Sequence, residues 1–342
     1  MIRVRRARRI AVAAAYGGGG AGAVGAAVFG LLATQAKIAR RTIGLPTAQP
    51  PAASGWYGTG SGEELRVAFL GDSTAAGLGV HRPQETPGAV LAAGLARLSG
   101  RAVRLTNVAV TGARSTDLER QVQLALEDRP HVAVIMIGAN DVTHRVRPST
   151  SVRLLEQAVR RLRAADVEVV VGTCPDLGTI EPIAQPLRWV ARRWSRQLAA
   201  AQTIAVVEAG GRTVSLGDVL APEFAARPSE MFGPDRFHPS AAGYGSAASA
   251  LLPSACAAIG CSAEVEAPPD VRRGEGLRSV AVAAVEAAER PGTEVSGAQV
   301  AGRERGPRGR WALLRHRNSP ELSAAGPPDE RRFTGEDGQA RP

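Results

Sequence analysis

The sequence has very few residues of the kinds that build metal centres and disulfide frameworks. It has three cysteines among 342 residues, and none shows the CxxC or Cys/His spacing of a metal site. We therefore expect neither a metal ion nor another cofactor. Cys256 and Cys261 are close enough in sequence to form a disulfide outside the cytoplasm, which would leave Cys174 unpaired. Alternatively, all three cysteines are small packing residues.

Acidic residues are absent from the N-terminal end of the chain, and this decides how the net charge is interpreted. The net charge of +10 at first suggests a nucleic-acid-binding protein. Residues 1–41 hold seven Arg and one Lys with no acid, whereas residues 262–342 hold 13 Arg against 13 Asp and Glu, which leaves only +2 for the middle. A nucleic-acid-binding domain concentrates positive charge on its folded part. We therefore expect no nucleic acid partner.

Charged residues are also absent from positions 10–36, directly after five arginines. A membrane-spanning helix needs about 20 residues, and the preceding arginines favour an orientation with the N-terminus inside. The run exceeds the apolar core of about 7–15 residues that a cleavable signal contains. We favour an uncleaved single-pass membrane anchor with the following domain outside the cytoplasm. Secretion after removal of this signal segment is the alternative.

Composition divides the chain into four parts. After the basic N-terminus and anchor or signal segment (1–41), residues 42–61 are rich in Pro, Gly, Ser and Thr, which predicts a linker. Residues 62–261 alternate short apolar runs with amphipathic segments, as is typical of one α/β domain. Residues 262–342 are rich in Pro, Gly, Arg and Glu, and we predict a disordered tail because they hold too little apolar surface for a core.

Five apolar runs in the predicted domain are expected to be strands, with helices between them. Strands joined by crossover helices form a parallel sheet that is covered on both faces. We therefore expect an α/β fold, a three-layer α/β/α sandwich with a central, mainly parallel five-stranded sheet. The predicted strands are 65–71, 102–110, 131–141, 167–176 and 203–210, and the predicted helices are 87–100, 115–126, 151–165, 186–202 and 240–259.

Residues that can carry chemistry follow the ends of the first three predicted strands. Ser73 follows the first strand, Gly112 the second and Asn140 the third. A segment before the last predicted helix adds Asp235 and His238. Because ligands bind beyond the carboxyl ends of the strands in parallel α/β sheets, we expect these five residues to share one site.

This set supplies what acyl transfer by a serine requires. The Ser73 hydroxyl needs a base, such as the His238 imidazole, and Asp235 can orient that imidazole. The backbone N–H groups of Ser73 and Gly112 and the amide of Asn140 are suitable donors to the oxyanion of a tetrahedral intermediate. Taken singly, Ser73 fits a helix N-cap and Asn140 fits a turn. The complete set in this order favours a catalytic site.

The motifs GDST, NVAVTGARS, GAND and DRFHP, in this order, resemble the sequence blocks of the SGNH hydrolases, also called GDSL esterases and lipases. The resemblance spans most of the predicted domain and implies the flavodoxin-like fold of that family. It also implies a catalytic triad and an oxyanion hole. Their members would be Ser73, Asp235 and His238 for the triad, and Ser73, Gly112 and Asn140 for the oxyanion hole.

The resemblance implies a serine ester hydrolase that works through an acyl-enzyme intermediate. Its substrate would be a small-molecule, lipid or acyl-sugar ester. An acyltransferase on the same fold is the alternative, and a non-catalytic module that binds acyl or sugar groups is less favoured. Thr74 stands where the family usually has leucine, but its side chain is not expected to take part in the chemistry. The sequence does not name the ester, because the pocket walls lie in loops.

Overall fold

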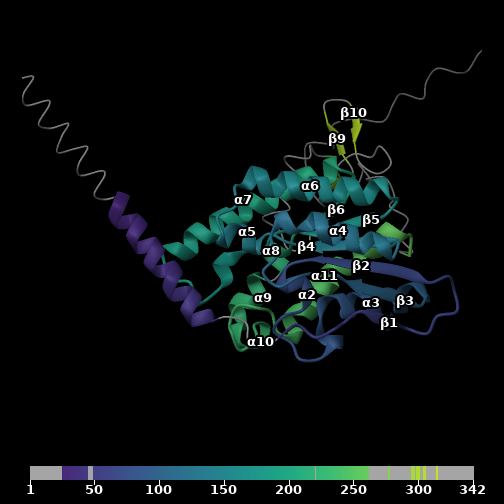
Figure 1. Cartoon of the computed structure of the whole chain (residues 1–342), viewed down its shortest axis with the longest axis horizontal. Helices are drawn as coiled ribbons and strands as arrows, with labels where there is room; N and C mark the ends of the chain where they lie inside the picture. The colour runs from purple at the N-terminus through teal and green to yellow at the C-terminus, as the bar shows by residue number, and fades with distance from the viewer. Residues whose placement is uncertain are drawn as a thin grey trace, which may run out of the picture.

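A seven-stranded sheet is the centre of the computed structural model (Figure 1), with the strand order β1-β3-β2-β4-β5-β6-β8. The five inner strands are parallel, and the two edge strands are antiparallel. The strands are Gly55–Tyr57 (β1), Leu65–Gly71 (β2), Val103–Asn107 (β3), Val132–Met136 (β4), Glu168–Gly172 (β5), Arg212–Val214 (β6) and Glu294–Ser296 (β8). The structure describes residues 25–44, 49–219 and 221–261, together with 276–277, 294–296, 298–300, 303–305 and 313–314.

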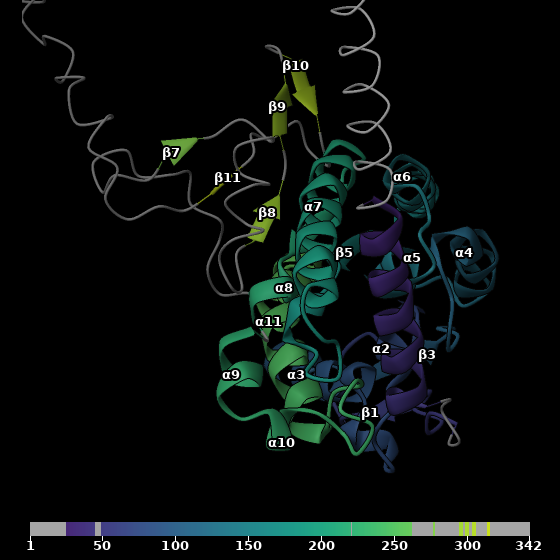
Figure 2. The same cartoon turned by 90° about the vertical axis from the view of Figure 1, so that its left-hand side faces the viewer.

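Helices cover both faces of the sheet. The helices after the first strand are Ser73–Ala76 (α2), Pro87–Ser99 (α3), Leu118–Glu127 (α4), Ala139–Thr143 (α5), Pro148–Ala164 (α6), Leu187–Glu208 (α7), Leu216–Val219 (α8), Ala221–Ala226 (α9), Pro228–Met231 (α10) and Ala241–Ile259 (α11). Three short 3-10 turns lie at Pro83–Glu85 (η1), Ser115–Asp117 (η2) and Leu177–Thr179 (η3). Figure 2 shows α3 and α11 on one side of the sheet and α4 and α6 on the other. The predicted three-layer α/β/α sandwich is confirmed.

The alternation of side chains along β2 separates the two halves of the core. Leu65, Val67 and Phe69 are buried in the cluster that also contains the apolar residues of α3 and α11. Ala68 and Leu70 are buried in the cluster with α4, α6 and the end of α7. Successive side chains of a strand point to opposite faces of the sheet. A strand such as β2, with apolar residues at both alternating sets of positions, can therefore be buried on both faces.

The prediction of a fifth strand at residues 203–210 was wrong. Residues 203–208 belong to α7, and the fifth parallel strand is β6. The β-branched residues of this stretch favour a strand locally, but their burial follows the helix. Gln202 and Val206, one helical turn apart, are both completely buried against the sheet. Tertiary packing therefore decides the conformation here.

Both edge strands come from segments outside the predicted domain. β1 lies in the stretch expected to be a linker and pairs antiparallel with β3. β8 lies in the stretch expected to be a disordered tail and pairs antiparallel with β6. The other short tail strands, Gly276–Leu277 (β7), Ala298–Val300 (β9), Arg303–Arg305 (β10) and Leu313–Leu314 (β11), form two small two-stranded pairs. Most of 262–342 lies outside the described residues, so its disorder stays a prediction.

A helix over residues 25–43, here called the N-terminal helix, lies beside the start of α7 (purple in Figure 1). Within the part of the chain that the structure describes, no helix has the length and apolar character to span a bilayer. The first half of the charge-free run at 10–36 lies outside the described residues. The predicted membrane anchor therefore stays a prediction.

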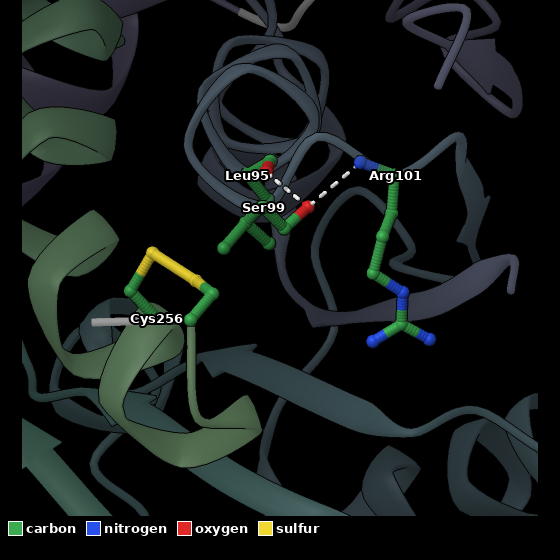
Figure 3. Close-up of a disulfide and its surroundings, with 5 residues drawn as sticks. Leu95, Ser99, Arg101 and Cys256 are labelled. Carbon is green, nitrogen blue, oxygen red and sulfur yellow. Dashed lines mark hydrogen bonds between the residues drawn. A yellow bond between two sulfur atoms is a disulfide. The ribbon is translucent and has the colours of Figure 1, made fainter. Parts of the chain in front are cut away.

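A disulfide joins Cys256 and Cys261 at the end of α11, with a Cα–Cα distance of 4.9 Å. It lies beside the last turn of α3, where the Ser99 hydroxyl donates a hydrogen bond to the carbonyl of Leu95 (Figure 3). The disulfide therefore links the last turn of α11 to Cys261, which follows the end of this helix. Cys174 is a buried free thiol, and burial raises its pKa well above the ordinary value.

Candidate active site

A sharp turn after β2 presents Ser73 at the carboxyl edge of the sheet. Gly71 has φ of +137°, and a Cβ at this position would clash with the carbonyl oxygen of Met136. Glycine is therefore required here. The Asp72 carboxylate caps the short helix α2 by accepting a hydrogen bond from the Thr74 N–H at 2.9 Å. Ser73 is the first residue of α2, and it is only 7% exposed.

A buried glutamine braces this turn from the neighbouring layer. The Gln121 side chain, on α4, accepts a hydrogen bond from the Gly71 N–H at 2.7 Å and donates one to the Gly71 carbonyl at 2.9 Å. Gln121 is 2% exposed. The sequence does not indicate this role, because one glutamine in an amphipathic helix gives no signal that it points inward.

Ser73, His238 and Asp235 lie in one hydrogen-bonded line. The Ser73 Oγ is 3.0 Å from His238 Nε2, and His238 Nδ1 is 2.6 Å from Asp235 Oδ2. Ser73 and His238 are 165 positions apart in sequence, so the fold brings them together. With Nδ1 donating to the carboxylate, Nε2 is left to accept the serine proton.

The loop before α11 fixes the geometry of the Asp235–His238 pair. The other carboxylate oxygen of Asp235 accepts hydrogen bonds from the N–H groups of Phe237 at 3.0 Å and His238 at 2.9 Å. Burial alone would raise the pKa of Asp235, but the hydrogen bonds from the His238 ring and these N–H groups outweigh it and lower this pKa. Asp235 therefore stays ionised beside the imidazole. The Phe237 ring meets the His238 ring edge to face at 4.8 Å.

Gly112 and Asn140 follow the two strands that flank β2: Gly112 lies in the loop after β3, and Asn140 lies in α5, after β4. The Asn140 Nδ2 donates a hydrogen bond to the carbonyl of Ala113 at 3.0 Å, which ties α5 to the loop after β3. Gly112 occupies the turn before Ala113 with φ of +81°, a conformation that favours glycine. Asn140 lines the cavity beside Ser73, whereas the exposed Gly112 is not among the lining residues.

Asp141 has a structural role that the sequence did not indicate. It is 1% exposed, and its carboxylate accepts hydrogen bonds from the N–H and the hydroxyl of Ser115, the latter at 2.9 Å. The Ser115 hydroxyl lies 2.9 Å from that of Ser151 on α6. Burial raises the pKa of Asp141, while the Ser115 hydrogen bonds act in the opposite direction. This network anchors α5, the helix that carries Asn140.

A cavity of about 50 Å³, open to solvent, lies beside Ser73 and His238. Most of its walls are apolar, which suits the acyl part of an ester better than a charged ligand. The lining residues are Ser73, Thr74, Ala139, Asn140, Pro175, Asp176, Leu177, Thr179, Ile180, Gly217, Phe224, Phe232, Phe237, His238 and Pro239. Across the described residues, no group of three or more His, Cys, Asp or Glu side chains is arranged to hold a metal ion.

The buried carboxylate of Asp72 has a measurable consequence for stability. Burial raises its pKa from 3.8 to about 6, although the Thr74 N–H hydrogen bond opposes this shift. Because the folded state binds this proton more tightly than the unfolded state, the ionised group destabilises the fold above about pH 6. The difference in pKa corresponds to about 3 kcal/mol.

Asp72→Asn is therefore expected to increase the free energy of unfolding at pH 8 by up to about 3 kcal/mol. Asparagine keeps an acceptor for the Thr74 N–H but carries no charge. The gain should shrink as the pH falls from about 6 towards 3.8, because wild-type Asp72 takes up its proton in the folded state over this range, and it should vanish below 3.8, where both states are protonated. Urea unfolding at pH 8 and pH 4 measures the difference. A variant that is less stable than wild type at pH 8 would contradict the expectation.

A serine, a histidine and an aspartate in one line at the carboxyl edge of an α/β sheet are the arrangement that serine hydrolases use. A sequence profile of the GDSL-like lipase/acylhydrolase family matches residues 69–245, more than half of the chain. The chain belongs to this family and is a GDSL-type ester hydrolase. The resemblance found in the four motifs is thereby confirmed.

The chain is also similar to individual known proteins. The chain is 44% identical over 234 residues to the GDSL-like esterase Rv1075c of Mycobacterium tuberculosis, an alignment that covers 65% of this chain and 74% of that protein. Among solved structures, the acetylxylan esterase Axe2 of Geobacillus stearothermophilus matches at 21% identity and a TM-score of 0.43, over 59% of this chain and 95% of that one. TesA matches at 23% identity and a TM-score of 0.43, over 57% and 97% of the two chains.

Proposed function

We propose that the protein hydrolyses carboxylic esters with Ser73 as nucleophile, His238 as general base and acid, and Asp235 as the group that orients the imidazole. The observation that carries this proposal is the pair of hydrogen bonds at 3.0 Å and 2.6 Å that joins the three side chains beside an apolar cavity. An active-site serine of this kind reacts with fluorophosphonates. Labelling of the purified protein by a fluorophosphonate, together with turnover of p-nitrophenyl esters, tests the proposal.

The first half of the reaction transfers the acyl group to the enzyme. The Ser73 Oγ attacks the carbonyl carbon of the ester while its proton passes to His238 Nε2. The ionised Asp235 stabilises the imidazolium through Nδ1. When the tetrahedral intermediate collapses, His238 gives the proton to the leaving alcohol oxygen, and an ester on Ser73 remains.

The second half repeats these steps with water. Water attacks the acyl carbon, its proton passes to His238, and the Ser73 Oγ leaves with that proton as the carboxylic acid is released. An alcohol in place of water would make the enzyme an acyltransferase. Product analysis with added glycerol or methanol distinguishes the two activities, since a transferase would form the new ester in preference to the free acid.

The developing oxyanion needs donors on the cavity side of Ser73. The Ser73 N–H lies in the first turn of α2, where a backbone N–H has no partner within the helix. Asn140 has two amide hydrogens, and the one that binds Ala113 O orients the amide, which leaves the other for the substrate. We assign the third donor to the Gly112 N–H. This last assignment rests on the family resemblance alone.

Asn140→Ala is expected to lower kcat by about 10²–10³-fold and to change KM much less. The amide acts mainly on charge that develops in the transition state, so its loss costs about 2.7–4 kcal/mol there. Steady-state kinetics on p-nitrophenyl acetate measures the effect. Asn140→Asp keeps the size of the side chain but removes the donors and adds a carboxylate that repels the oxyanion, so it should be at least as impaired. An unchanged kcat in Asn140→Ala would remove this residue from the oxyanion hole.

The substrate class follows from the cavity walls and the relatives. The aromatic and aliphatic lining favours an uncharged acyl chain. The relative in Mycobacterium tuberculosis is named an esterase, and Axe2 is named an acetylxylan esterase. We therefore propose small-molecule, lipid or acyl-sugar esters as substrates. A panel of p-nitrophenyl esters from acetate to octanoate and of acetylated sugars separates these classes.

We also propose that the enzyme is held at the cell membrane by residues 10–31, the first 22 positions of the charge-free run, with its catalytic domain outside the cytoplasm. The charge-free run behind five arginines supports this topology. The Cys256–Cys261 disulfide is consistent with an oxidising compartment. Protease added to intact cells should degrade the domain, whereas a domain found free in the medium would indicate a cleaved signal.

A further inference from the structure

The N-terminal helix is docked on the catalytic domain through a defined face. Its less exposed residues recur at the three- and four-residue spacing of one helix face: Leu32, Ala33, Gln35, Ala36, Ala39 and Ile43. Figures 1 and 2 show the helix running alongside α5 and the start of α7. This face therefore packs against the domain.

Directed hydrogen bonds fix the position of this helix. The Gln35 side chain donates to the carbonyl of Gln185 at 2.5 Å and accepts from the N–H of Leu187 at 3.1 Å, at the start of α7. On the other side, the Arg40 guanidinium donates to the carbonyl of Thr143, at the end of α5, at 3.1 Å. The helix is thus bonded to two elements that adjoin the candidate active site.

The apolar contacts of the helix reach the cavity wall itself. Ala39 is 6% exposed and belongs to one apolar cluster with Leu177, Ile180, Ile183 and Ala191. Ile43, Ala139, Val142, Leu187 and Phe237 pack against the same cluster. Four members of this set also line the cavity: Leu177, Ile180, Ala139 and Phe237. The N-terminal helix therefore packs behind residues whose other side faces the cavity.

The segment 176–183, here called the wall segment, is held from two sides. Towards α7, the Asp176 carboxylate pairs with Arg192 and Arg196, and the Leu177 N–H donates to the Ser195 hydroxyl at 3.2 Å. On its other side the N-terminal helix completes the apolar cluster. Without that helix, Ala39 and Ile43 would leave an unfilled space behind the wall segment, and apolar side chains would shift to fill it.

We propose that the N-terminal helix is a structural part of the acyl pocket and sets its selectivity for acyl chain length. The proposal rests on the ester hydrolysis proposed above. In this proposal an acetyl group stays close to Ser73, whereas a longer chain lies along Leu177, Ile180 and Phe237, which line the cavity. Loosening the wall segment should therefore penalise long acyl chains and spare short ones. The residues 32–43 act as positioning residues, since they support the lining side chains and do not touch the substrate.

Ala39→Arg in the full-length protein tests this proposal, because a charged side chain cannot occupy the buried contact without displacing the helix. We expect kcat/KM for p-nitrophenyl octanoate to fall by about tenfold or more, with the value for the acetate within about twofold of wild type. Thr34→Arg is the matched control, because it places the same charge on an exposed position of the same helix. It should keep the wild-type ratio of the two activities.

The outcomes separate the two proposals. A wild-type protein that neither hydrolyses these esters nor reacts with a fluorophosphonate would overturn both. An active wild type with the same chain-length preference in Ala39→Arg would overturn the role of the helix alone. If Ala39→Arg does not fold, as judged by circular dichroism, Gln35→Ala decides, since it removes only the hydrogen bonds to Gln185 and Leu187. A reduced preference for octanoate then supports the proposal, and an unchanged preference overturns it.

Discussion

Replacing Ser73 with alanine is expected to abolish ester hydrolysis and to leave the fold intact. The Ser73 Oγ lies 3.0 Å from His238 Nε2 at the cavity, so it is the hydroxyl whose proton the imidazole can accept in the proposed reaction. Loss of the nucleophile in enzymes with this arrangement lowers kcat by about 10⁶-fold. The remaining rate, from the oxyanion donors and substrate binding, should exceed that in water by about 10³–10⁴-fold.

The measurement is kcat/KM on p-nitrophenyl acetate, with fluorophosphonate labelling as an independent readout. Ser61→Ala is a suitable control, because this serine is exposed and lies before β2. The Ser73→Ala protein should retain the circular dichroism and the unfolding midpoint of the wild type, since the hydroxyl is bonded only to His238 in the described structure. Activity and labelling near wild-type levels would refute the assignment of Ser73 as nucleophile.

The second large effect concerns His238 and Asp235. His238 moves the proton in both halves of the reaction, so His238→Ala should be nearly as damaging as Ser73→Ala. Asp235 only orients the imidazole and stabilises its charge, so Asp235→Ala should lower kcat less, by about 10⁴-fold. The double variant should be no worse than His238→Ala, because the carboxylate contributes only through the base.

The pH profile gives a second test of the same pair. Wild-type kcat/KM should fall as the pH drops, because the protonated imidazole cannot accept the serine proton. The hydrogen bonds that lower the pKa of Asp235 keep this carboxylate ionised over that range. His81→Ala is the control for the histidine variant, since His81 is exposed. A silent His238→Ala would refute the serine hydrolase mechanism, and a silent Asp235→Ala would require another group to orient the imidazole.

The sequence predicted most of the site because its residues follow strand ends. Ser73 and Asn140 stand directly after buried apolar strands that are adjacent in the sheet, so their proximity follows from the topology. Asp235 and His238 are three positions apart, and one short loop brings them into contact. Four of the five parallel strands were predicted because each is a short, mainly apolar segment between helical segments, and β4 is wholly apolar.

The remaining features depend on contacts between distant parts of the chain. β-branched residues at 203–207 favour a strand locally, but burial of Gln202 and Val206 against the sheet keeps them in α7. In the sequence Asp141 resembles a turn residue, and its structural role depends on the hydrogen bond that it accepts from Ser115, 26 positions away. Gln121 is unremarkable in sequence, yet it satisfies both backbone groups of Gly71. No local pattern carries such information, because each partner lies many residues away.

The two short edge strands also bear on how the molecule behaves at high concentration. β1 and β8 cover β3 and β6, the outer strands of the parallel sheet. An uncovered strand presents a row of free backbone N–H and C=O groups, which can pair with a strand of another molecule and start aggregation. A chain shortened to 62–261 would lose both covering strands. Shortened versions of the enzyme should therefore begin before the N-terminal helix, which also retains β1, and should keep the residues up to Ser296.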